Sequence, residues 1–91
     1  MFFVYVIQNL NNGKIYIGYT ADLEARLKRH NRLLPNKRTS FTSKNRGIWK
    51  VVYSETFEGR VEARRREREL KGSRGRAFIK QVITRNHALI A

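Results

Sequence analysis

The stretch Lys14-Ile15-Tyr16-Ile17-Gly18-Tyr19-Thr20 decides how the rest of this sequence can fold. Its β-branched and aromatic residues are typical of a strand. Gly18 is unusual there, because glycine weakens a strand and often marks a place where another group approaches the backbone closely. The strand therefore predicts a gap in the sheet surface, with tyrosine hydroxyl groups on either side of it.

A second apolar stretch, Phe2 to Gln8, precedes this strand and has a similar composition. The linking residues Asn9-Leu10-Asn11-Asn12-Gly13 favour a tight turn, so the two stretches are predicted to form a β-hairpin. If the loop closes with an even number of residues, Tyr5, Tyr16 and Gly18 share one face of the sheet, because side chains alternate along a strand. An odd number would separate them. The opposite face would then carry a core of Phe2, Val4, Val6, Ile15, Ile17 and Tyr19.

The rest of the chain predicts helices and one further strand. Thr20 to Leu23 offers helix caps, and Gly72 and Ser73 offer a stop and a new start. The expected elements are a helix ending at about Leu33 or Leu34 before Pro35-Asn36, a loop over 36–47, a strand Ile48–Phe57, and helices Arg60–Lys71 and Ser73 to about Arg85. The order β-β-α-β-α-α predicts an α/β (α+β) fold in which helices flank a small three-stranded antiparallel sheet. Residues 1–91 are expected to form one domain.

The charge balance narrows the class of partner. Lys and Arg number 20 against 7 Asp and Glu, a net charge of +13. Such an excess on a small domain favours a polyanion, most simply nucleic acid. A membrane surface fits less well, because no segment combines a basic face with a broad apolar one. The absence of cysteine excludes disulfides and thiolate metal sites. Neither a signal peptide nor a membrane span is evident, so a cytoplasmic protein is expected.

The first helix is expected to hold two polar side chains beside the core. Leu23 and Leu27, with Leu34, define its apolar face at about 100° per residue. His30 falls inside that face and Arg26 at its edge.

The second helix, Arg60–Lys71, is nearly all charged, and its clearest apolar stripe consists of Ala63 and Leu70. Glu67 lies between these two residues. A lone carboxylate on such a stripe could pair with an arginine or bind a cation.

Tyrosine, arginine and glutamate beside a notch in a basic domain suit phosphodiester cleavage. Arg26 can neutralise charge on phosphoryl oxygens. Glu67 can hold a divalent cation such as Mg²⁺, which keeps most of its water. Tyr5 or Tyr16 can position or deprotonate a water molecule, and Gly18 would leave room for the sugar-phosphate backbone.

These residues resemble a known family, the GIY-YIG nuclease domains, and especially small stand-alone bacterial members. Tyr16-Ile17-Gly18 matches the second signature, whereas Phe3-Val4-Tyr5 keeps only the tyrosine of the first. The segment from Tyr16 to Leu27 looks like the core motif, with Arg26 in the place of the catalytic arginine. His30 matches a further active-site position of some members, and the segment Glu62 to Gly72 resembles the one that supplies the metal-binding glutamate, here Glu67.

The resemblance implies a metal-dependent endonuclease that acts on nucleic acid, expected to be DNA, with one Mg²⁺ or Mn²⁺ and a role such as repair or recombination. It implies that the first tyrosine is the general base. Asn86 is a weak candidate for a late site asparagine. The expected nucleic-acid contacts are Gly18, Lys28, Arg29, Arg64, Arg65 and Lys71. Two alternatives stay open: a non-catalytic nucleic-acid-binding module with the same fold, and a basic protein-interaction module.

Overall fold

The structure, a computed structural model, describes the backbone of residues 1–31 and 47–90 and the side chains of 1–31 and 47–85. The elements are β1 (Phe2–Asn9), β2 (Ile15–Thr20), α1 (Leu23–His30), β3 (Trp49–Phe57), α3 (Arg60–Lys71) and α4 (Ser73–Ile90). Within these residues the three strands form one antiparallel sheet in the order β2-β1-β3. The predicted fold and element order are confirmed. Expectations that fall on 32–46, including Leu33, Leu34 and most of the loop, lie outside the described residues.

The loop of the hairpin contains an even number of residues, which is the condition for Tyr5, Tyr16 and Gly18 to lie on one face of the sheet. Gln8 pairs with Ile15 and encloses residues 9–14, and Tyr5 pairs with Gly18. Tyr5, Tyr16 and Gly18 therefore share one face of the sheet, as predicted for an even loop. Asn9 stabilises the turn, because its Oδ1 accepts hydrogen bonds from the backbone N–H groups of Asn11 and Asn12 at 2.8 and 3.1 Å.

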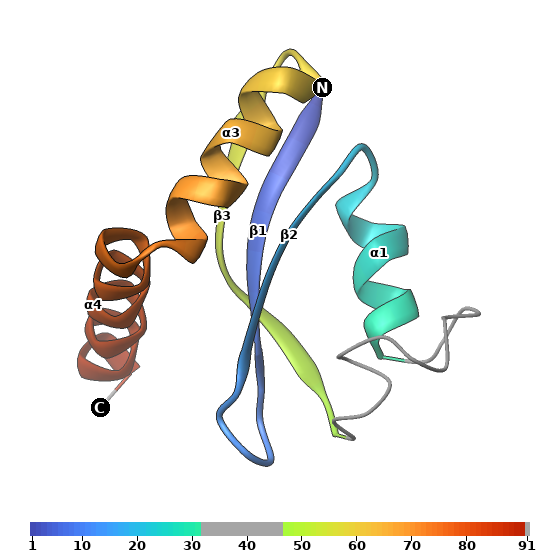
Figure 1. The fold of residues 1–91 in the computed structure, drawn as a ribbon. Coiled ribbons are helices and arrows are strands. Elements are labelled where there is room, and N and C mark those ends of the chain that lie inside the picture. The colour runs from blue at the N-terminus through green and yellow to red at the C-terminus, as the bar shows by residue number, and fades with distance from the viewer. Residues whose placement is uncertain (32–46, 91) are drawn as a thin grey trace.

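The sheet separates two apolar clusters. On one face, α1 packs over a cluster formed by Tyr5, Ile7 and Trp49. On the other face, α3 and α4 pack over a larger cluster, whose buried members are Val4, Val6, Ile17, Ala63, Leu70 and Ile79. Figure 1 shows this arrangement, with α1 on one side of the strands and α3 and α4 on the other. The central strand β1 is consequently buried on both faces, which makes it the most constrained element of the fold.

Two helix ends differ from the prediction. α1 begins as expected, since the Asp22 side chain accepts a hydrogen bond from the backbone N–H of Ala25 at 3.1 Å. It ends at His30, earlier than predicted, because the Asn31 side chain is bound to β3. Its Oδ1 accepts from the Trp49 N–H at 2.7 Å, and its Nδ2 donates to the Trp49 carbonyl at 3.0 Å. α4 runs on to Ile90, past the expected end at about Arg85. None of the described helices has the length and hydropathy that a bilayer crossing requires.

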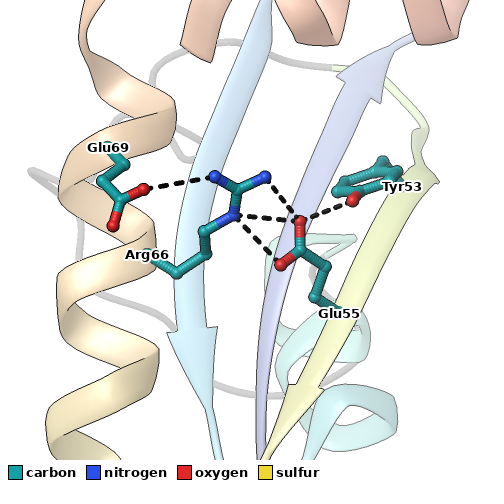
Figure 2. A network of polar contacts seen from close by, with 4 residues as sticks. All are labelled: Tyr53, Glu55, Arg66 and Glu69. Carbon is teal, nitrogen blue, oxygen red and sulfur yellow. Dashed lines mark hydrogen bonds and ion pairs between the residues drawn. The ribbon is translucent and has the colours of Figure 1, made fainter.

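A polar network, drawn in Figure 2, sets the orientation of α3 on the sheet. Arg66 Nε donates to both carboxylate oxygens of Glu55 on β3, at 3.0 and 3.1 Å, and Arg66 also pairs with Glu69 at 3.3 Å. The Tyr53 hydroxyl donates to the same Glu55 carboxylate. Burial alone would raise the pKa of Glu55, but the bonds from Arg66 and Tyr53 hold it below its ordinary value.

This network decides where the next residue of α3 points. Successive residues of a helix are about 100° apart around its axis. Ala63 and Leu70 face the sheet, and Arg66 lies to the β3 side of that stripe. Glu67 therefore leans to the opposite side, over β1 and β2, against which α3 also packs.

We expect Arg66→Met to lower the free energy of unfolding by about 1–3 kcal/mol, because it leaves the partly buried Glu55 carboxylate without its cation. The neighbouring Arg65 is exposed, so Arg65→Met is the matched control and should change stability by less than about 0.5 kcal/mol. Urea denaturation followed by circular dichroism measures both. Equal effects of the two substitutions would contradict the role assigned to the network.

Candidate active site

The face of the sheet beneath α1 gathers polar side chains from three elements. Tyr5 comes from β1, Tyr16 from β2, and Arg26 and His30 from α1. The Tyr5 and Tyr16 rings lie 6.2 Å apart between centroids, and the His30 ring lies 5.8 Å from Tyr5 and 5.0 Å from Tyr16. Arg26 makes side-chain hydrogen bonds to both tyrosines. The structure thus brings together two tyrosines predicted on the hairpin and two polar residues predicted on the first helix.

The side chain of Tyr5 occupies the gap above Gly18. A Cβ atom at residue 18 would lie 2.7 Å from the Tyr5 hydroxyl oxygen, 2.9 Å from Tyr5 Cζ and 3.0 Å from Tyr16 Cε1. The space where a Cβ would lie is therefore filled by the Tyr5 side chain, and the contact between Gly18 and the sugar-phosphate backbone stays a prediction. Glycine is required because the tyrosine lies directly across the neighbouring strand.

Tyr5 and His30 form a buried hydrogen bond, with 2.9 Å between the Tyr5 hydroxyl oxygen and His30 Nε2. Burial, reinforced by the positive charge of Arg26, lowers the pKa of His30 to about 4. The imidazole is therefore neutral at neutral pH, and Nε2 is best assigned as the acceptor of the Tyr5 O–H. Arg26, a donor only, then donates to the Tyr5 oxygen.

The same surroundings keep Tyr5 protonated in the free protein. Burial raises the pKa of Tyr5 above its ordinary value, and the hydrogen bond from Arg26 opposes that rise without cancelling it. The hydrogen bond to Tyr5 also raises the pKa of Arg26, so that the guanidinium stays charged. The cluster is thus a fixed cation, a neutral phenol and a neutral imidazole, joined in that order by hydrogen bonds.

Glu67 approaches this cluster from α3, on the other face of the sheet. Its side chain is only 16% exposed, and its carboxylate pairs with Lys71 Nζ at 2.6 Å. Its negative charge is a minor contributor, after burial, to the raised pKa of Tyr5. Glu67 therefore acts electrostatically on the cluster, while its direct contact is with Lys71 and not with Arg26.

The remaining residues predicted to contact nucleic acid are exposed and lie on both faces of the sheet. Lys28 is exposed and pairs with Glu24 at 3.5 Å, and Arg29 is exposed beside it. Arg64 and Arg65 are exposed on α3, on the opposite face of the sheet from the tyrosine cluster. The side chain of Asn86 lies outside the described residues, so its assignment stays a prediction.

Sequence reasoning missed two partners of these residues. The pair between Glu67 and Lys71 has the i,i+4 spacing of helical ion pairs, which could have predicted it. The contact of Asn31 with Trp49 had no comparable signal, because it joins residues on either side of the segment 32–46.

Comparison with known proteins identifies the class of this chain. The sequence model of the GIY-YIG catalytic domain matches residues 1–80. The chain therefore belongs to the GIY-YIG family, as its Tyr16-Ile17-Gly18 signature indicated.

Particular relatives are small proteins named UPF0213. One from Staphylococcus epidermidis is 38% identical over 69 residues, which is 76% of this chain and 78% of the relative. One from Staphylococcus aureus is 36% identical over the same length. The solution NMR structure of a UPF0213 protein from Bacillus halodurans is 30% identical, covers 92% of this chain and 84% of that one, and superposes with a TM-score of 0.50.

The packing at Gly18 predicts a measurable cost for any side chain there. Gly18→Ala should lower the free energy of unfolding by about 1–3 kcal/mol, because the new methyl group overlaps Tyr5. Gly72→Ala is the control, since a Cβ there lies 3.4 Å from its nearest neighbour, the Glu69 carbonyl. Thermal and urea denaturation compare the two variants. A neutral Gly18→Ala would show that Tyr5 does not occupy this space.

The buried neutral imidazole predicts a pH dependence of stability. A histidine in an unfolded chain titrates near about 6.5, whereas the pKa of His30 in the folded protein is about 4. The unfolded state therefore takes up the proton more readily, so stability is greatest above about pH 6.5 and falls as the pH drops toward 4.

Urea denaturation between these pH values should show a smaller fall in stability for His30→Gln than for the wild type. An NMR titration gives the direct measurement. A His30 ring that titrates near its ordinary value would contradict the assignment of a buried neutral imidazole.

Proposed function

We propose that this protein is a metal-dependent endonuclease that hydrolyses phosphodiester bonds in DNA. Membership of the GIY-YIG catalytic domain family supports a nuclease. The observation that carries the proposal further is the hydrogen-bonded chain from Arg26 through Tyr5 to His30. Arg26 supplies a permanent positive charge, and the Tyr5–His30 hydrogen bond can carry away the proton of an attacking water. Hydrolysis of a phosphodiester uses charge neutralisation and removal of a proton.

Each residue of the chain then has a role that follows from its chemistry. Arg26 binds a non-bridging phosphoryl oxygen and offsets the charge that grows in the transition state. Tyr5 accepts the proton of the attacking water as it passes its own proton to His30 Nε2. Tyr16, the second hydroxyl bound to Arg26, orients the water or the phosphate. A phosphate beside Arg26 would also raise the pKa of His30, because it offsets the charge that lowers it.

The carboxylates near the cluster limit how a divalent metal could bind there. The described residues contain no group of three His, Cys, Asp or Glu side chains that could hold one. Mg²⁺, however, is commonly bound through one or two carboxylates, substrate phosphate oxygens and water. A single partly buried carboxylate such as Glu67 fits that pattern. When bound there, Mg²⁺ or Mn²⁺ would supply positive charge for the phosphoryl oxygens and the leaving group.

One observation favours the alternative of a non-catalytic nucleic-acid-binding module. Lys71 already neutralises Glu67, as a structural ion pair would, and several arginines of α3 are exposed. Binding without cleavage would be strongly dependent on salt and independent of metal. The same measurements separate this alternative from a protein-interaction module, which predicts little affinity for DNA.

The proposal predicts cleavage of at least one of nicked, branched or single-stranded DNA in the presence of Mg²⁺ or Mn²⁺. Arg26→Gln should reduce the rate by about a hundredfold or more, the size seen when one charge-stabilising donor is removed. Glu67→Gln should reduce it similarly and also weaken Mn²⁺ binding, measured by electron paramagnetic resonance. Glu24→Gln, on the exposed side of α1, is the matched control and should cleave normally.

Full activity of Glu67→Gln would remove the assignment of the metal ligand. If no substrate is cleaved but DNA binds in EDTA, the non-catalytic alternative is correct.

A further inference from the structure

A groove of about 830 Å³ runs between the edge strand β2 and helix α4. Its apolar lining comes from both elements, with Ile15 and Ile17 on β2 and Ile79 and Ile83 on α4. This volume lies within the roughly 300–1,000 Å³ that is usual for ligand sites. The groove is therefore large enough to hold part of a substrate and not only water.

The charged residues among the described lining of the groove are all basic. Lys71, Arg76 and Lys80 line it, and no Asp or Glu is found among its described lining residues. The Arg76 Nε donates to the Lys71 carbonyl at 3.1 Å, which holds this guanidinium at the groove. Lys80 is exposed one helical turn further along α4. Cations spaced along an apolar channel are complementary to a chain of phosphates that carries flat, uncharged bases.

The groove is continuous with the candidate active site through two residues. Tyr16 lines the groove and also belongs to the tyrosine cluster, because β2 is at the edge of the described sheet. Lys71 lines the groove and is the partner of Glu67. A strand lying in the groove would therefore pass directly beside the groups that are proposed to act on a phosphodiester.

We propose that this groove binds an unpaired strand of nucleic acid next to the scissile phosphate, so that the substrate has a single-stranded segment at the cleavage site. This inference rests on the proposed function and adds the class of substrate. The cations meet the phosphates, and the partly exposed Ile15, Tyr16 and Ile83 meet the faces of the bases.

An unpaired strand fits the lining better than a duplex does. In a duplex the base faces are stacked and unavailable, so a duplex would use the cations and leave the isoleucine surface without a partner. In a single strand the base faces are free, and contact with apolar and aromatic side chains contributes to affinity without sequence preference. The groove joins both kinds of contact in one channel.

The first test measures binding in EDTA, where cleavage is blocked. A fluorescent single-stranded oligonucleotide and a blunt duplex of equal length are titrated at several salt concentrations. Arg76→Gln/Lys80→Gln should weaken single-strand binding and reduce the slope of log K against log salt by roughly 1.4, as two lost phosphate contacts predict. Lys80→Gln alone should give about half of that change. Arg60→Gln, exposed at the start of α3 and not part of the groove lining, is the matched control and should leave the slope unchanged.

The second test locates the strand. The chain has no cysteine, so an introduced cysteine is unique. Thr84→Cys places a thiol at the groove, and Thr56→Cys places one at an exposed position on β3. Oligonucleotides with a thiol tethered to one base should form a disulfide with Thr84→Cys when unpaired, and should react at least about tenfold less with Thr56→Cys or when paired in a duplex.

These measurements separate the two proposals. Loss of cleavage in Arg26→Gln with intact single-strand binding supports the groove independently of the chemistry. Equal losses in Arg60→Gln, equal effects on duplex and single strand, or equal cross-linking at positions 84 and 56 would each overturn the groove assignment, even if the protein cleaves DNA. Absence of any oligonucleotide binding would overturn it as well.

Discussion

The contact between Tyr5 and Gly18 is the constraint on which the candidate site depends. Tyr5 lies on the central strand, is fully buried on the face covered by α1, and extends its hydroxyl over the one residue of β2 that has no side chain. Because the register pairs these residues directly, any shift of the hairpin would replace glycine with a larger neighbour. The packing of one phenol therefore fixes the register, and the register fixes where Tyr16 stands.

Burial of Tyr5 also creates the electrostatic character of the site. The hydroxyl can leave water only if other groups satisfy it, and Arg26 and His30 do so from α1. The same loss of solvent keeps the imidazole neutral and the phenol protonated. Stability and proposed chemistry thus share one hydrogen-bonded chain, and a substrate phosphate would disturb it by adding negative charge beside Arg26.

The two faces of the sheet contribute differently. α1 supplies Arg26 and His30 to the polar cluster on one face. On the other face, α3 and α4 cover the larger apolar cluster, and α4 forms one wall of the basic groove. The link between them is the orientation of α3, which Arg66 secures by its bonds to Glu55 (Figure 2). With Arg66 directed toward β3, Glu67 and Lys71 are directed toward the edge of β2, where the cluster and the groove meet. Arg66 does not contact the cluster, but by fixing the rotation of α3 it determines that Glu67 and Lys71 lie beside it.

The sequence by itself determined the element order, the common face of Tyr16 and Gly18 within one strand, and the inward position of His30, because each follows from a local pattern, such as the period of two or 3.6 residues. Turn residues and caps likewise placed most element boundaries within a residue. Only the tertiary structure decided that the even hairpin brings Tyr5 onto the face of Tyr16, that Tyr5 fills the gap at Gly18, that Asn31 ends α1, and that α4 closes a basic groove against β2. Most of these depend on distances between residues far apart in the chain, and the protonation of His30 depends on the solvent that packing removes; no local pattern encodes either quantity.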